Sequence, residues 1–290
     1  MKLDEIFDEY ILKSEQLILA KRSINEIAVN EIKRLHQKKE KEQDVTGNKN
    51  STHSVDFFLI QDIKSGETIR YKNIRSTVDE NIKQIVLHKN KQYQWILTES
   101  FEIFREYLIK SYAYLGYKDK NIWQLKDYGS IVLSELESKD YSFFLEQAKT
   151  KKDIPDSILT KFRNVFPEYK NLEICNKLEK NLRFEINVIE HFRHIIVHCG
   201  GQTTEKEILI EKILKKSGLW NNGKYDKEKY DFISSFFPLK ESNDLIILLE
   251  IELNNKDGFP NKYDDILYNL ISSLTSISYL IFNELKAITK

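Results

Sequence analysis

The chain has 290 residues, of which 41% are hydrophobic, and its 45 basic side chains are balanced by 45 acidic ones. A chain of this length and composition can bury a sizeable core, so we expect one main domain with an appended segment. The balanced charge excludes a protein that coats nucleic acid by bulk positive charge, and any nucleic acid would be met at a local basic site.

The cysteines and the apolar runs predict the compartment. The only cysteines are Cys175 and Cys199, which are too few for the disulfide framework of a secreted protein. The run Met1–Glu5 lacks the basic region and apolar stretch of a signal peptide. No apolar run in the sequence approaches the roughly 20 residues that cross a bilayer. We therefore expect a cytoplasmic protein without a membrane partner.

The first 75 residues are expected to form a helical arm. Apolar residues between Leu3 and Leu35 recur at spacings near three and four, which predicts an amphipathic helix or a helix pair. The charge run Lys38–Glu42 and the polar run Thr46–Ser51 predict a solvated loop after it and a boundary.

A small hairpin is predicted at the end of this arm. Two β-favouring runs, Asp56–Ile60 and Thr68–Tyr71, flank the turn-forming residues Lys64–Glu67. The arm and hairpin together cover residues 1–75, and the remainder, residues 76–290, is expected to be a separate helical domain.

The remainder is dominated by helical periodicity, which predicts a mainly α fold. We expect an all-α bundle with four core helices, to which the N-terminal arm and small β-hairpin excursions are attached. The predicted helices are Asp79 to about Gly116, about Asp127 to Ala148, a shorter one after Pro155, Leu172–His198 and Tyr263–Ile288. On the helix Leu172–His198, one apolar stripe at spacings of three and four is predicted to consist of Leu178, Leu182, Ile186, Ile189, Phe192 and Ile196. The apolar run Asp244–Leu253 is either a strand or a buried helix, because its pattern fits both.

The stretch from Glu190 to Gly201 concentrates groups for phosphate chemistry on about two turns of helix. It holds three of the six histidines, and an arginine, Arg193, lies among them. The glycine pair that follows is expected to end the helix. An arginine can bind a phosphate with two parallel charge-assisted hydrogen bonds, and histidine changes its charge nearest neutral pH. This combination indicates phosphodiester chemistry.

Arg193, the polar His194, the aliphatic run Ile195–Val197 and then His198 near a helix end resemble the arginine-x4-6-histidine signature of the HEPN superfamily, the higher eukaryote and prokaryote nucleotide-binding domains. The segment 196–200 is especially similar to bacterial members from toxin and phage-defence systems. The resemblance covers about residues 79–290. It implies a helical bundle with a metal-independent endoribonuclease site that needs no cofactor and is formed at the seam of a homodimer.

Helical geometry leads to the same expectation of a dimer. On an ideal helix Arg193 and His198 lie roughly 140° apart, so one protomer does not clamp a phosphate between them unless the helix ends or distorts there. In an isologous dimer, two copies of each residue could line one cleft.

The predicted function is therefore cleavage of single-stranded or looped RNA by attack of the 2′-hydroxyl. His198 would transfer protons, Arg193 would hold the phosphate, and His194 would orient the substrate. By analogy with the family, the protein would be a toxic effector in bacterial anti-phage defence or in a toxin–antitoxin system, with an antitoxin or defence protein as a partner.

Other interpretations of the same residues stay open. Arg193 could pair with Glu190 or another carboxylate, and His198 could only stabilise the helix C-terminus. The three histidines fall within about 60° on a helical wheel beside Cys199, which is compatible with a metal site, although Cys199 is more typical of a small helix-end residue. The aromatic residues Tyr107, Tyr112, Tyr114, Tyr117 and Trp123 fit a core better than a base-stacking surface.

At the level of function, the alternatives are a non-catalytic HEPN-like module that binds RNA, a nucleotide or a protein, and a structural helical protein that acts through its arm. Growth arrest by the wild type but not by variants at Arg193 and His198 would separate the first alternative from a nuclease.

Overall fold

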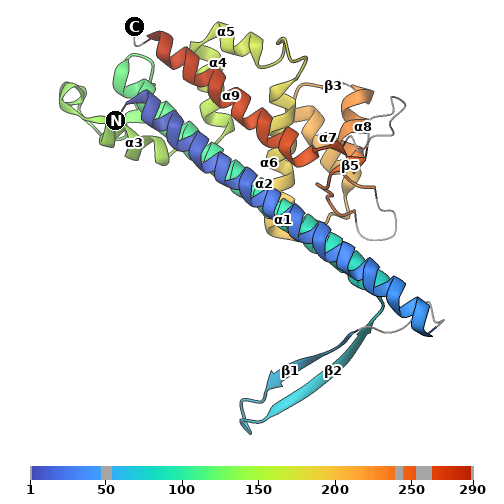
Figure 1. The fold of residues 1–290 in the computed structure, drawn as a ribbon. Coiled ribbons are helices and arrows are strands. Elements are labelled where there is room, and N and C mark those ends of the chain that lie inside the picture. The colour runs from blue at the N-terminus through green and yellow to red at the C-terminus, as the bar shows by residue number, and fades with distance from the viewer. Residues whose placement is uncertain (1, 47–53, 222, 239–243, 253–262, 289–290) are drawn as a thin grey trace. The chain divides into compact units, whose positions relative to one another are not determined.

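The computed structural model describes residues 2–46, 54–221, 223–238, 244–252 and 263–288. Within these residues the fold is mainly α-helical, and every sheet is a two-stranded antiparallel one (Figure 1). This confirms the predicted fold class, a mainly α bundle with small β-hairpins.

Long helices form the N-terminal part and shorter ones follow. The helices are α1 (Leu3–Thr46), α2 (Val78–Lys118), α3 (Tyr141–Lys149), α4 (Asp156–Val165), α5 (Pro167–Leu172), α6 (Leu182–Cys199), α7 (Lys206–Lys216), α8 (Lys227–Ser235) and α9 (Ile266–Ile288). The strands are β1 (Ser54–Gln61), β2 (Thr68–Ser76), β3 (Trp220–Asn221), β4 (Lys224–Tyr225), β5 (Ile251–Glu252) and β6 (Tyr263–Asp264).

The chain divides into two compact units. The first contains residues 1–19 and 93–290, and the second contains residues 20–92. Both boundaries lie inside the long helices α1 and α2. We predicted a boundary at residue 75, which lies within the second unit, one residue before the end of β2. The units are divided inside α1 and α2 instead, because each of these helices contributes residues to both units.

In the first unit, the start of α1 packs antiparallel to the second half of α2. Lys13 pairs with Glu106 at 2.7 Å, and Lys110 pairs with Glu9 at the same distance. Phe7 stacks on Phe282 of α9, with 4.6 Å between the ring centroids. These contacts join the first helical turns of the chain to its last helix.

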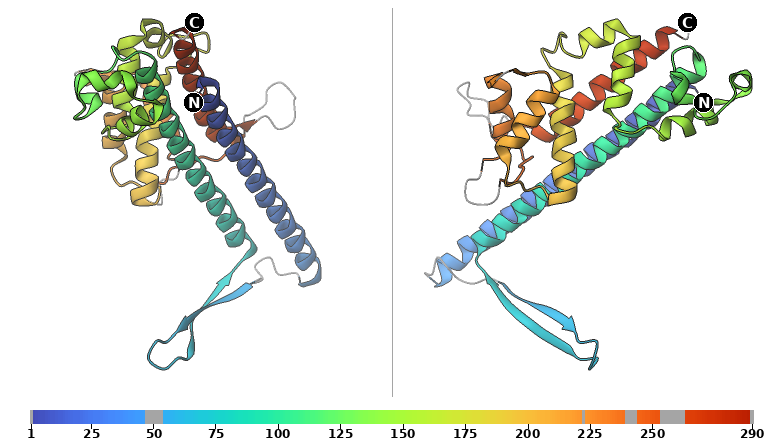
Figure 2. Two further views of the ribbon diagram at one scale, coloured as in Figure 1. Left: turned by 90° about the vertical axis from the view of Figure 1, so that its left-hand side faces the viewer. Right: turned by 180° about the vertical axis from the view of Figure 1, so that it is seen from behind.

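The core of the first unit includes α6 packed against α9, as two views in Figure 2 show. The inward stripe of α6 contains Ile186, Ile189 and Phe192, which are at most 3% exposed. We predicted these three residues as part of an apolar stripe, but its last member is Ile195 rather than Ile196, and Leu178 is 63% exposed.

The predicted helix Leu172–His198 is wrong over its first third. Helix α5 ends at Leu172, and α6 begins only at Leu182. Between them, the Asn176 side chain donates to the carbonyls of Leu172 and Lys180, and it accepts hydrogen bonds from two backbone amides. Asparagine that binds the backbone in this way competes with the helical ladder. Asn181 then caps α6 by accepting from the amide of Phe184 at 3.0 Å.

A buried carboxylate joins the two sides of this break. Glu173 is fully buried, and its two oxygens pair with Arg163 of α4 at 2.7 Å and with Arg183 of α6 at 2.8 Å. The three side chains thus fix where α6 starts relative to α4.

The predicted helix from Asp127 to Ala148 is also wrong in its first half. Short 3₁₀ helices occupy Leu125–Tyr128 and Leu133–Ser138, and α3 starts only at Tyr141. Gly129, with a φ of 67°, ends the first 3₁₀ helix, and the side chain of Asp140 caps the start of α3. The helix predicted after Pro155 is confirmed as α4, and the one from Asp79 is confirmed as α2.

The apolar run at residues 244–252 is neither a long strand nor a helix. Leu245, Ile246 and Leu248 are buried, but this segment contributes only an isolated bridge from Leu245 to Gln202 and the two-residue strand β5. Leu253 lies outside the described residues. The helices α7 and α8 were not predicted, and they pack against each other beside α6.

The last helix, predicted from Tyr263, starts at Ile266, and Tyr263 lies in β6. Among the described residues, α9 is the one helix long and apolar enough to cross a membrane, and half of its apolar window is buried inside the protein. Core helices of globular proteins have the same character.

In the second unit, α1 continues to Thr46, so the charge run Lys38–Glu42 is helical rather than a loop. Lysine and glutamate are good helix formers, which is why the run extends the helix. Residues 47–51 of the predicted loop lie outside the described residues. The predicted hairpin is confirmed as β1 and β2, with a bulge between Phe58 and Leu59.

Candidate active site

Helix α6 carries the predicted site residues on one polar face. Ile189, Phe192 and Ile195 turn inward, whereas His194 and His198 are exposed and Arg193 is partly exposed. The helix is amphipathic, so the buried stripe fixes which side chains reach the outside. The motif is therefore not sealed in the core.

The end of α6 is held by a close backbone contact. Gly200 has a φ of 62° and Gly201 a φ of 81°, and the amides of both donate to the carbonyl of Ile195. A Cβ on Gly201 would lie 2.5 Å from the side-chain amide of Gln94. Gln94, which is buried, donates to the carbonyl of Ile246 at 2.6 Å, and the Ile246 amide donates to Gly201 at 2.9 Å. The predicted end of α6 at the glycine pair is thus confirmed, and the hydrogen bonds of Ile246 with Gly201 and Gln94 connect this helix end to α2.

An open cavity of about 610 Å³ lies beside Arg193 and His194. Its walls come from α2, α6, α7 and the segment before α4. The lining residues are Phe101, Glu102, Arg105, Asp153, Ile154, Glu190, His191, Arg193, His194, Lys212 and Lys216. Four of these side chains are basic and three are acidic, and two are histidines, so the cavity can accommodate an anion next to proton-transfer groups.

Arg193 is held in the cavity by Glu102 of α2. Its Nη2 lies 2.6 Å from Glu102 Oε1, and both side chains are about one-third exposed. The Nε atom is buried without a hydrogen-bond partner among the described residues. One edge of the guanidinium is therefore occupied by a carboxylate. Glu190, the partner that the sequence suggested, pairs instead with Lys216 at 2.7 Å.

The three histidines of α6 have different surroundings. His194 lines the cavity, and its ring centroid is 4.5 Å from that of His198, which lies one turn further on and does not line the cavity. His191 also lines the cavity, and its Nδ1 lies 2.8 Å from the carbonyl oxygen of Asn187. Burial lowers the pKa of His191 below its ordinary value, and this outweighs the opposing hydrogen bond and the charge of Glu190.

The structure thus brings Arg193 and His194 together in one cavity, with His198 against His194. Among the described residues, no three histidine, cysteine, aspartate or glutamate side chains are arranged to hold a metal ion. Cys199 is exposed beside His198 and has no disulfide partner.

Four of the five aromatic residues that we assigned to the core lie there, and the fifth, Tyr117, is partly exposed. Tyr107, Tyr112, Tyr114 and Trp123 are at most 5% exposed, and Tyr112 stacks on Trp123 with 4.6 Å between ring centroids. These four side chains are closed to nucleic-acid bases.

Sequence reasoning missed Glu102, and it considered His191 only as a metal ligand. Glu102 is on α2, far from the motif in sequence, and nothing local distinguishes it from other helix glutamates. His191 was visible as part of the histidine cluster, but its contact with Asn187 depends on the rotamer in the fold.

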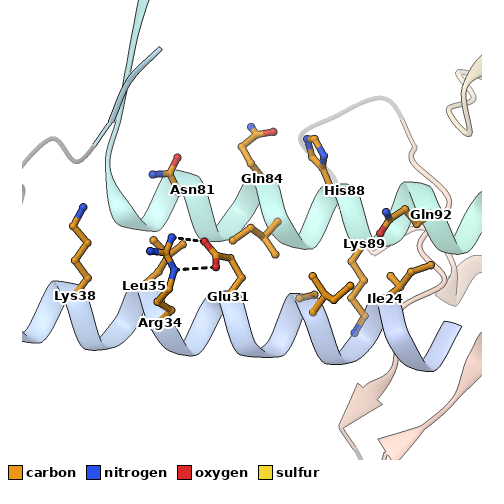
Figure 3. A pocket seen from close by; sticks show the side chains of 13 residues that line it. Ile24, Glu31, Arg34, Leu35, Lys38, Asn81, Gln84, His88, Lys89 and Gln92 are labelled. Carbon is orange, nitrogen blue, oxygen red and sulfur yellow. Dashed lines mark hydrogen bonds and ion pairs between the residues drawn. The ribbon is translucent and has the colours of Figure 1, made fainter. Parts of the chain in front are cut away.

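The second unit has a groove of its own, of about 480 Å³ between its stretches of α1 and α2 (Figure 3). Its floor includes Ala28 and Leu35, and Glu31 pairs with Arg34 of the same helix at 2.6 Å. No constellation for acid–base chemistry is seen among the side chains that line this groove, so the cavity beside Arg193 is the better candidate site.

Comparison with protein-family models, with curated proteins and with solved structures found no match for this chain. The chemistry of the site is therefore indicated by its own geometry and by the motif.

Proposed function

We propose that this protein is a metal-independent, HEPN-type endoribonuclease that cleaves single-stranded or looped RNA. The observation that carries the proposal is that Arg193 and His194 share an open cavity of about 610 Å³, while the ring of His198 lies against His194. Phosphate-binding and proton-transfer groups are thereby exposed together rather than buried.

Each side chain has a defined task in this reaction. RNA cleavage by the 2′-hydroxyl needs a base for that hydroxyl, an acid for the leaving 5′-oxygen and a cation for the charge that develops on the phosphate. Arg193 would supply the cation through Nη1, because its Nη2 is paired with Glu102 and its Nε is buried. His198 would transfer a proton, and His194 would orient the substrate. None of these tasks requires a cofactor.

A homodimer is part of the proposal. Arg193 and His198 lie roughly 140° apart on the helical wheel, so a second copy that meets α6 at a two-fold axis would complete the cleft. The exposed end of α6 supports this arrangement, since Val197, an apolar side chain between Arg193 and His198 in the sequence, is 47% exposed.

The ion pair between Arg193 and Glu102 favours a second candidate, a non-catalytic module that binds RNA, a nucleotide or a protein. In that case Glu102 neutralises Arg193, and the pair serves only to connect α6 to α2. The two candidates differ in whether loss of Arg193 abolishes chemistry or only lowers stability.

The deciding experiment is RNA cleavage by the purified full chain in excess chelator, with analysis of the product ends. A nuclease of the proposed kind leaves 2′,3′-cyclic phosphate, because the attacking group is the neighbouring hydroxyl. His198→Ala and Arg193→Ala should abolish or strongly reduce cleavage, whereas His36→Ala, which changes an exposed histidine of α1, should not. Products with 3′-hydroxyl ends, or loss of activity on chelation, would indicate a metal-activated water instead.

The cellular setting is proposed by analogy with the family: a cytoplasmic toxic effector that an antitoxin or defence protein controls. Expression of the wild type should arrest bacterial growth, and the Arg193→Ala and His198→Ala variants should not. Equal toxicity of all three proteins would contradict a nuclease mechanism.

A further inference from the structure

His191 is held in one tautomer by its own helix. Its Nδ1 lies 2.8 Å from the backbone carbonyl of Asn187, which can only accept a hydrogen bond. The proton of a neutral His191 ring is therefore on Nδ1. The other ring nitrogen, Nε2, has no hydrogen-bond partner among the described residues, and it is the atom of this ring with a free lone pair for a molecule in the cavity.

The surroundings of His191 favour the neutral ring. Burial is the largest influence and lowers its pKa, and Lys216 and His194 act in the same direction, whereas Glu190 opposes them. Other charged groups that line the same cavity are Glu102, Arg105, Asp153, Arg193 and Lys212. A neutral imidazole with an open Nε2 can accept a proton but cannot donate one from that atom.

The spacing along α6 separates two proton-transfer positions. His191 and His198 are seven residues apart, which places them on nearly the same face with a rise of about 10 Å between them. Attack and departure at phosphorus are in line, so the base and the acid must approach from opposite sides of the phosphate. His198 does not line the cavity itself, but its ring lies against that of His194, which does. A phosphate bound over His194 would therefore have His191 on one side along the helix and His198 on the other.

We propose that His191 is the general base of the reaction. This assignment rests on the proposed function. His191 Nε2 takes the proton of the 2′-hydroxyl and becomes an imidazolium, and the freed oxygen forms the new bond to phosphorus. The bond from phosphorus to the 5′-oxygen breaks, and a protonated His198 donates its proton to that leaving oxygen. The products are a 2′,3′-cyclic phosphate and a 5′-hydroxyl, and the two histidines have exchanged protonation states.

A substrate with sulfur in place of the bridging 5′-oxygen separates the two roles. A thiolate leaves without protonation, so this RNA still needs a base but no longer needs an acid. The informative variant is His191→Asn, because the asparagine amide can still donate to the Asn187 carbonyl while it lacks a basic nitrogen. His198→Ala is the matched comparison.

On ordinary RNA, both variants should lower the single-turnover rate by about 10²- to 10⁴-fold. On the sulfur-substituted RNA, His198→Ala should recover to within about tenfold of the wild type, whereas His191→Asn should stay as impaired as before. Wild-type rates for His191→Asn on ordinary RNA, or its recovery on the sulfur substrate, would overturn the assignment. A wild-type protein that cleaves neither RNA overturns the proposed function and with it the role of His191.

A measurement on the unmodified protein guards against a variant that does not fold. The pH profile of kcat/KM for the wild type should fall on the acid side with an apparent pKa below the ordinary histidine value of 6.5, because the base must be neutral. An acid limb centred above that value would contradict His191 as the base.

Discussion

Replacing Gly201 with alanine tests whether the end of α6 is held by a close backbone approach. The new Cβ would lie 2.5 Å from the amide group of Gln94, a distance that no real contact tolerates. Gln94 cannot turn aside freely, because its Nε2 donates to the carbonyl of Ile246 at 2.6 Å in a buried environment. The backbone φ of 81° adds strain for any residue with a Cβ.

The size of the effect follows from these two contributions. The left-handed conformation costs a non-glycine residue about 1–2 kcal/mol. Displacing Gln94 breaks its buried hydrogen bond to the Ile246 carbonyl, which costs about 1–3 kcal/mol. We therefore expect Gly201→Ala to lower the free energy of unfolding by about 2–5 kcal/mol. Urea titration followed by circular dichroism measures this change as a lower midpoint at an unchanged slope.

Gly218→Ala is the matched control. Gly218 has a φ of 74°, but a Cβ at this position would meet no heavy atom within 4 Å, so only the conformational strain should be seen. A double-mutant cycle isolates the steric clash, because in a Gln94→Ala background Gly201→Ala should cost only that strain. Equal losses for Gly201→Ala and Gly218→Ala, or a cycle without coupling, would refute the reasoning.

The remaining predictions test the chemistry, an ion-pair cluster, a titration and the assembly. His198→Ala should lower the rate of RNA cleavage by about 10²- to 10⁴-fold while RNA binding survives, and Arg193→Lys should recover only part of what Arg193→Ala loses, since lysine cannot form two parallel hydrogen bonds; a folded, fully active His198→Ala protein would end the catalytic hypothesis. Glu173→Ala should lower the free energy of unfolding by about 3–5 kcal/mol, because two arginines lose a fully buried carboxylate. Glu146→Ala, which removes an exposed pair, should cost less than about 1 kcal/mol, and similar losses for both changes would contradict the role of the cluster. Burial lowers the pKa of His191, so as the pH falls the histidine is protonated in the unfolded chain before it is protonated in the folded protein. The free energy of unfolding is therefore at its full value above the ordinary pKa of 6.5, and it decreases as the pH drops through 6.5 toward the folded-state pKa. In urea titrations at several pH values, His191→Asn should make this decrease of the free energy of unfolding with falling pH smaller. The same pH dependence in the variant and the wild type would contradict this prediction. Light scattering at micromolar concentration should give a dimer, and a species of only 34.5 kDa would contradict the proposed composite site.

Helix α6 shows which structural features local sequence patterns predict. The apolar spacing of α6 predicted that Ile189 and Phe192 face the core, and the glycine pair predicted where the helix ends. Both features depend on residues within a few positions of one another. The start of α6 was predicted wrongly, because apolar spacing does not register the polar contacts that break the helix. Asn176 binds the carbonyls of Leu172 and Lys180, four residues away on either side, and the buried Glu173 pairs with arginines ten residues away on either side.

By itself, the sequence was sufficient for the mainly α class, the β1–β2 hairpin and the placement of Arg193, His194 and His198 near the end of one helix, since periodicity and turn residues act over short distances. It did not predict whether these side chains are exposed or buried. Only the tertiary structure decided what those side chains meet. It paired Glu102 with Arg193, placed His191 in the wall of the cavity and brought the backbone of Gly201 close to the side chain of Gln94. These contacts join elements that are far apart in the chain or depend on a rotamer chosen by packing, and no local pattern encodes them.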